Sequence, residues 1–113
     1  MTDDGQIALD GPIGAPDHHR VVFENDRVRV IRAVIPAGDT APLHTHLTPH
    51  LIIVTSGSQF VRRAPDGSVL LDTREQEAEV ALPPFLWTDG IPAHTLENVG
   101  PDAIVTLAVE LKA

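Results

Sequence analysis

Short apolar runs separated by turn residues dominate the pattern of this chain from about residue 20 onward. The segment Arg27-Val28-Arg29-Val30 alternates strictly between polar and apolar side chains, as expected for a strand with one buried face. Asp66-Gly67 stands between two such runs and is a strong hairpin signal. The runs predict strands at residues 21–23, 28–35, 43–46, 50–55, 60–63, 69–71, 80–82, 85–88, 94–98 and 104–111.

Helical periodicity is missing from every stretch long enough to hold a helix. Residues 73–79 come nearest, but they are short and polar, so we expect a loop there with at most one helical turn. Ten short strands in about ninety residues predict an all-β sandwich or barrel. We expect one domain, with residues 1–20 as an N-terminal arm and residues 21–113 as the β-barrel domain.

Composition narrows the classes of partner and of metal site. The chain has 113 residues with 16 acidic against 8 basic, a formal net charge of −8, which disfavours nucleic acid and anionic membrane surfaces. It has no cysteine, so disulfides, thiolate catalysis and cysteine-ligated metals are excluded, and a metal would need His, Asp, Glu or backbone oxygen. No apolar run approaches transmembrane length, and the acidic start of the chain is unlike a secretory signal, so we expect a cytoplasmic location.

Three histidines of equal parity lie within seven residues, at His44, His46 and His50. On strands, residues two apart share a face, so these imidazoles point the same way. A helical reading, with His46 and His50 one turn apart, is disfavoured by Pro42 and Pro49. Each buried imidazole without a partner would cost roughly 1–3 kcal/mol, whereas a shared divalent metal would accept a lone pair from all three. The spacing therefore predicts a metal site.

The other histidines give weaker signals. His94, taken alone, is typical of an ordinary hydrogen-bonded strand residue. His18 and His19 are adjacent, would face opposite ways on a strand, and lie in the expected arm, so we expect both to be solvated.

The histidine spacing resembles the first motif of the cupins, G-x5-H-x-H-x3/4-E-x6-G. Here the pattern reads Gly38, His44, His46, His50 and Gly57, and every spacing fits, with histidine where most cupins carry glutamate.

The second cupin motif, G-x5-P-x-G-x2-H-x3-N, is matched more loosely. His94 and Asn98 have the required spacing, whereas Gly90 lies one residue too far from His94 and the upstream proline is missing. The resemblance covers roughly residues 21–111.

This resemblance implies a conical antiparallel barrel of two packed sheets, also called a double-stranded β-helix or jelly roll, with a metal inside. It implies His44, His46 and His94 as ligands, with His50 in place of the carboxylate. Some small cupins use four histidines in this arrangement, and some of these bind manganese. We expect one divalent transition metal per chain, with Mn or Fe favoured and Ni, Co, Cu and Zn left open.

Four neutral imidazoles would leave the ion its full +2 charge, which favours anionic ligands. An octahedral ion held by four protein ligands also keeps two open positions for a substrate, water or O2.

Strand parity suggests which side chains face the metal. Ile52 and Val54 share the parity of His50, and Leu96 and Asn98 share that of His94. The aromatic residues could instead form core, and Arg62 and Arg63 are more typical of a solvated hairpin. We find no evident catalytic residue, since nothing ties Glu97 or Glu110 to the cavity. The candidate pocket residues are Ile52, Val54, Phe60, Arg62, Phe85, Trp87, Leu96 and Asn98.

The sequence thus favours a small metal-dependent cupin that acts on a small organic molecule, with an O2-dependent oxygenase as the leading hypothesis. A non-redox lyase or isomerase that stabilises an enolate, and a non-catalytic metabolite-binding or sensor protein, are the alternatives. We also expect a homodimer, because sheet edges need cover and cupins of this size commonly form dimers. Apolar residues of the arm, Ile7, Leu9 and Ile13, could reach the partner.

Overall fold

A computed structural model describes residues 9–75 and 85–112. Within these residues, the regular elements are strands apart from a short helix and one 3-10 turn. In chain order the elements are α2 (Gly11–Gly14), β1 (His19–Glu24), β2 (Val28–Ile35), β3 (Thr40–His46), β4 (His50–Ser56), β5 (Phe60–Arg63), β6 (Val69–Asp72), η1 (Thr73–Glu75), β7 (Phe85–Thr88), β8 (Ile91–Asn98) and β9 (Ile104–Leu111).

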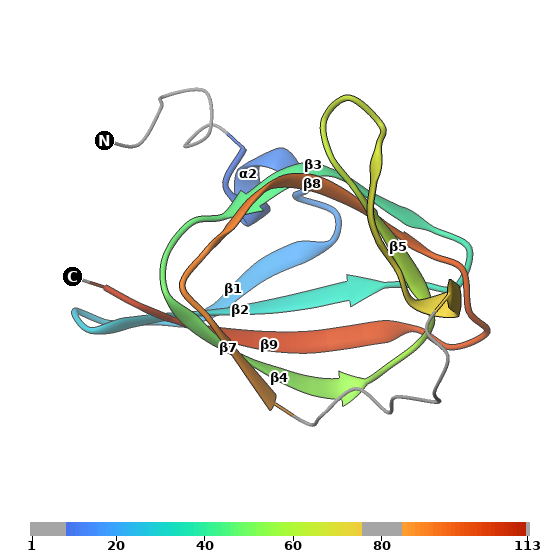
Figure 1. Cartoon of the computed structure of the whole chain (residues 1–113). Helices are drawn as coiled ribbons and strands as arrows, with labels where there is room; N and C mark the ends of the chain where they lie inside the picture. Colours follow the sequence, from blue (N-terminus) through green and yellow to red (C-terminus); the bar gives the residue numbers. More distant parts are fainter. Residues whose placement is uncertain (1–8, 76–84, 113) are drawn as a thin grey trace.

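Two antiparallel sheets face each other and enclose the interior of the molecule (Figure 1). One sheet has the strand order β1-β2-β9-β4-β7, and the other has the order β3-β8-β5-β6. The all-β prediction is confirmed, and β2, β5, β7 and β9 begin and end at the expected residues. The expected strand 80–82, and the part of 73–79 beyond η1, lie outside the described residues.

The longest pairing, between β2 and β9, runs without a bulge from Val28 opposite Leu111 to Ile35 opposite Ile104. Ile35 and Ile104 belong to a small core cluster with Ala41 and Phe60, packed at that end of the interior. At the other end of β9, Glu110 lies opposite His50 of β4. The histidines therefore gather at the end of the barrel away from this core.

Residues 9–14 of the expected N-terminal arm fold back onto the chain's own barrel, whereas Ile7 lies outside the described residues. The backbone N–H of Thr45 donates to the carbonyl of Leu9 at 2.7 Å, and Asp10 forms a bridge with Thr45. A Cβ at Gly14 would lie 2.6 Å from the carbonyl oxygen of Leu43, so only glycine allows so close an approach. These contacts place the segment on the chain's own strand β3.

Among residues 9–75 and 85–112, no helix has the length and apolar character needed to cross a membrane. The expected cytoplasmic location stays a prediction.

Candidate metal centre and pocket

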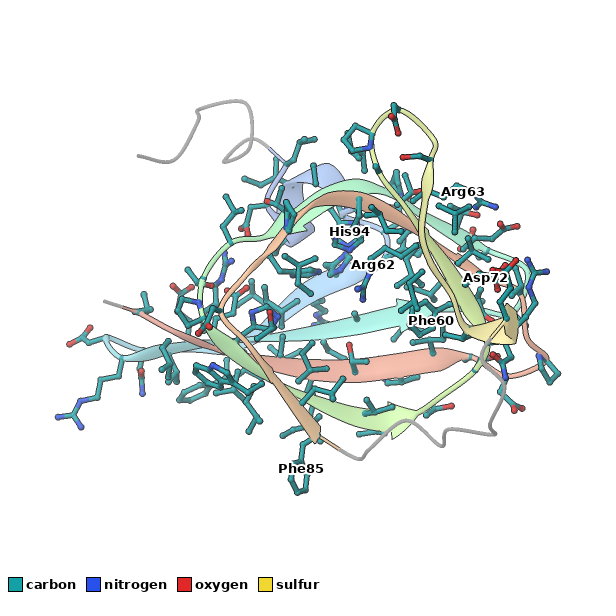
Figure 2. All side chains as sticks on the ribbon, in the orientation of Figure 1. Phe60, Arg62, Arg63, Asp72, Phe85 and His94 are labelled. Atoms are coloured by element: carbon teal, nitrogen blue, oxygen red, sulfur yellow. The ribbon has the colours of Figure 1, made fainter. Side chains whose placement is uncertain are left out.

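A cavity of about 120 Å³ lies between the two sheets. Its walls are mostly aliphatic, and five histidines line it together with one arginine, Arg62. Figure 2 shows His94 and Arg62 inside the barrel. The histidines are His19, His44, His46, His50 and His94.

His46 occupies the middle of this histidine cluster. Its ring centroid lies 4.9 Å from that of His44, 5.1 Å from His19, 5.6 Å from His50 and 5.9 Å from His94. The rings of His44 and His94, on directly opposed residues of β3 and β8, are 4.4 Å apart. The structure therefore places the four histidines expected as ligands around one cavity, whereas their joint coordination of a metal stays a prediction.

One set of three histidines is tighter than the rest. The donor nitrogens of His19, His44 and His46 all lie within 4.8 Å of one another, so these three could hold a metal ion. His19 is a site residue that the sequence argument missed.

The expectation that His19 is solvated is wrong. Strand β1 begins at His19, which lies opposite Ala33 of β2 and is 5% exposed. A Cβ at Gly11 would come within 3.1 Å of the His19 ring, so the arm covers this imidazole closely. His18 faces the other way and donates from Nε2 to Asp39 at 2.8 Å. Extending the strand 21–23 backward by two residues would have placed His19 on the face of Val21.

Backbone carbonyls orient the imidazoles. In three histidines, Nδ1 lies 2.7 Å from the carbonyl oxygen two residues earlier: His44 on Pro42, His50 on Thr48 and His94 on Pro92. In His19, Nδ1 lies 3.1 Å from the carbonyl oxygen of Ala15. Because a carbonyl only accepts, Nδ1 carries the proton in each ring, and Nε2 of the neutral imidazole keeps the lone pair that binds metals.

Burial favours the neutral form of four imidazoles of the cluster. Desolvation, with a smaller effect from neighbouring histidines, lowers the pKa of His19 and of His94 to about 4. The same cause lowers the pKa of His44 and, more strongly, of His46. Neutral imidazole is the form that a metal requires.

The residues present fit a divalent transition metal. Nδ1 of His46 is buried and has no hydrogen-bond partner among the described residues. Leaving such a nitrogen unpaired costs about 1–3 kcal/mol. A divalent ion bound by His46 through this nitrogen would offset that cost.

Five of the eight expected pocket residues line the cavity: Ile52, Val54, Phe60, Arg62 and Leu96. Phe85 and Trp87 do not, because Leu86 is paired with Ile52 and takes the inward position on β7. Phe85 is 63% and Trp87 54% exposed, and Figure 2 shows Phe85 projecting away from the barrel.

Asn98 is buried, but the described pocket lining does not include it. Its Nδ2 donates to the carbonyls of Ile35 at 2.9 Å and Asp102 at 2.7 Å, and its Oδ1 accepts from the N–H of Gly100 at 3.0 Å. Asn98 therefore holds the turn after β8 against the end of β2.

Arg62 and Arg63, the two adjacent arginines of the hairpin, lie in different environments. Arg63 donates to Glu97 at 2.8 Å in a partly exposed pair, in keeping with the solvated hairpin. Arg62 instead enters the cavity, and its Nε is buried without a partner among the described residues. The solvated reading is thus wrong for Arg62, because alternation on β5 turns it inward.

Glu110 lies beside the cluster, in a position that sequence reasoning could not assign. It is 2% exposed and directly opposite His50 on the neighbouring strand. Its Oε1 accepts from Nε of Arg29 at 2.7 Å, and Arg29 also pairs with Asp10 at 2.8 Å. This network ties the N-terminal segment to β2 and β9 next to the histidines.

Comparisons with known proteins identify the fold. No family model matches the chain, and no curated protein matches it. Among solved structures, a cupin domain from Bordetella pertussis is similar, with a TM-score of 0.61, 19% identity, and coverage of 84% of this chain and 92% of that one. A double-stranded β-helix protein from Klebsiella pneumoniae follows, with a TM-score of 0.55, 17% identity, and coverage of 82% and 74%.

A cupin-family protein from Methanocaldococcus jannaschii is also similar, with a TM-score of 0.54, 13% identity, and coverage of 82% and 77%. Likeness at such low identity shows the fold. The expected double-stranded β-helix is confirmed.

Proposed function

Because the chain has the cupin fold and gathers its histidines inside the barrel, we propose that it is a small metal-dependent enzyme. It acts on a small organic molecule at the histidine cluster. The observation that carries this proposal is the shared orientation of His44, His50 and His94, each with Nδ1 donating to a backbone carbonyl and Nε2 left with a lone pair that can bind a metal. Nothing in an ordinary apolar core requires that repeated arrangement.

His44, His46, His50 and His94 would hold the metal, with His19 as a neighbouring fifth donor. A bound divalent ion would supply Lewis acidity and, if it is manganese or iron, redox chemistry. The aliphatic walls, including Ile52 and Val54, exclude water from the space beside the cluster and strengthen electrostatic interactions there.

Within this class we propose an O2-dependent oxygenase. A neutral, all-imidazole donor set and a small cavity with mostly aliphatic walls support it, since both suit a site that admits O2 beside an organic substrate. The test is O2 uptake by the manganese- or iron-loaded protein with a panel of small organic acids, alcohols and phenols. We expect uptake that depends on both metal and one substrate class.

Other outcomes of the same panel identify the alternatives. Turnover under nitrogen with zinc or nickel would replace the oxygenase by a lyase or isomerase. Tight binding without turnover, unchanged by chelation, would indicate a metabolite-binding protein.

We further propose a homodimer formed through the outer face of the five-stranded sheet. The paired positions across this face form an apolar row: Phe23, Val30, Val109, Leu51 and Trp87. The five strands span about 24 Å across the sheet, and the eight residues of β9 span about 26 Å along it. The outer face of the sheet is therefore of the same order of area as the ~800 Å² that each partner buries in a stable interface.

Replacing Trp87 and Phe85, exposed aromatic residues of the edge strand β7, by serine is expected to weaken this dimer about 30-fold, because aromatic residues are enriched among the interface residues that contribute about 2 kcal/mol or more. Sedimentation equilibrium measures the change. Ile13→Ser is the matched control, since Ile13 is 61% exposed on the arm. A dimer weakened by Ile13→Ser and unaffected by the double variant would place the interface on the arm.

A further inference from the structure

The cavity holds a positive charge that no side chain in its described lining balances. Arg62 lies opposite Leu96 on β8 and enters the interior (Figure 2). The described lining includes no Asp or Glu, and no described residue forms an ion pair with Arg62. Its guanidinium carbon lies 5.7 Å from the centre of the Phe60 ring, which gives a cation–π contact but no counter-charge.

The contrast with the rest of the molecule is sharp. The chain carries a net charge of −8, and the neighbouring Arg63 has its carboxylate, Glu97, at 2.8 Å. Burial also lowers the pKa of the Arg62 guanidinium, which nevertheless stays charged at any ordinary pH. A divalent ion on neutral imidazoles would add to this positive charge, so an entering anion would gain from both.

The position of Arg62 fixes where that anion would lie. Leu96 and His94 are two residues apart on the same face of β8, so Arg62 is about 7 Å along the strand from His94. A head group bound at Arg62 would present its next one or two carbon atoms to the histidines. The cavity of about 120 Å³ equals the liquid volume of about four water molecules, so only a short-chain molecule fits.

We propose that the pocket selects a small monocarboxylate, with its carboxylate held by Arg62 and its short apolar body against Ile52, Val54 and Leu96. The planar guanidinium fork matches a carboxylate with two parallel hydrogen bonds. This substrate class rests on the proposed function only in placing the reacting carbon near the metal; recognition by Arg62 does not depend on turnover.

The test uses the full chain loaded with zinc, which is redox-inert, and NMR titration with butanoate and with butanamide. We expect butanoate to bind about 10- to 100-fold more tightly, the range for a charge-assisted pair. Arg62→Gln is expected to remove this preference, and Arg62→Lys to retain part of it. Arg63→Gln, which removes an external charge from the same hairpin, is expected to leave it unchanged.

Equal affinities in the wild type, or a preference that survives Arg62→Gln in a folded variant, would overturn the proposal. Thermal unfolding of each variant shows whether it is folded. A carboxylate preference without turnover of any acid would leave this inference standing and remove the proposed enzymatic function. Equal turnover of acids and their neutral amides would support the proposed enzymatic function and overturn the inference that Arg62 selects a carboxylate.

Discussion

Replacing His46 by alanine is expected to abolish most metal binding, lowering affinity by more than about 100-fold, beyond the range seen when only an outer-shell partner is lost. His46 contacts the rings of all four other histidines of the cluster, so its removal takes away a donor and leaves a hole among them. Elemental analysis after dialysis against limiting manganese or zinc measures the loss.

His50→Glu is expected to behave differently, because it restores the donor that most cupins carry at this motif position. We expect stoichiometric metal and weaker azide binding, since the carboxylate reduces the charge of the loaded site. The new carboxylate would stand directly opposite Glu110, and like charges at opposed positions are destabilising. The variant should therefore gain more stability from metal than the wild type does.

His19→Gln separates the two donor sets that the cluster allows. If the ion is held by His44, His46, His50 and His94, this variant should keep most of its metal affinity. If it is held by His19, His44 and His46, the loss should equal that of His46→Ala. A His50→Glu protein as empty as His46→Ala would show that His50 is needed and that glutamate cannot replace it, whereas His46→Ala with unchanged affinity would remove the cluster as the metal site.

The metal-free protein is expected to lose stability steeply as the pH falls from 6.5 toward 4. The pKa of His19 and of His94 is lowered from 6.5 to about 4 in the folded protein, so the unfolded chain binds more protons in this interval. Stability therefore rises with pH across this interval and is fully present above pH 6.5.

The expected loss is of the order of 3 kcal/mol for each of these two buried histidines, and His44 and His46 shift in the same direction. Typical domains have only about 5–15 kcal/mol to lose. Urea unfolding at pH 7 and pH 5, followed by circular dichroism, measures the difference. Bound metal should move the loss to lower pH because protons and metal compete for Nε2. An unfolding free energy that is constant between pH 7 and pH 4.5 would contradict the prediction.

Local patterns were sufficient to locate the strands of the described residues and the first part of the site. Residues two apart on a strand share a face whatever the strand pairs with, so His44 and His46 could be placed together from spacing alone. The same rule turned Ile52 and Val54 inward beside His50. Turn residues such as Gly38, with its positive φ of 80°, marked the ends of the strands.

Other parts of the site depend on pairing between distant strands. His94 faces His44 because β3 and β8 pair in that register, and His19 joins them because β1 extends back to it and pairs with β2. Phe85 and Trp87 face outward because Leu86 is the residue opposite Ile52.

The physical reason is that alternation along one strand gives two faces but does not say which face is inside. Arg62 and Arg63 are adjacent, and the sequence does not show which of them faces the interior. The position of β5 beside β8 turns Arg62 into the cavity and Arg63 toward Glu97. The sequence by itself therefore determined the strands and the grouping of three histidines. The tertiary pairing decided that His94, His19 and Arg62 join them in one cavity, and that the described lining of this cavity contains no carboxylate.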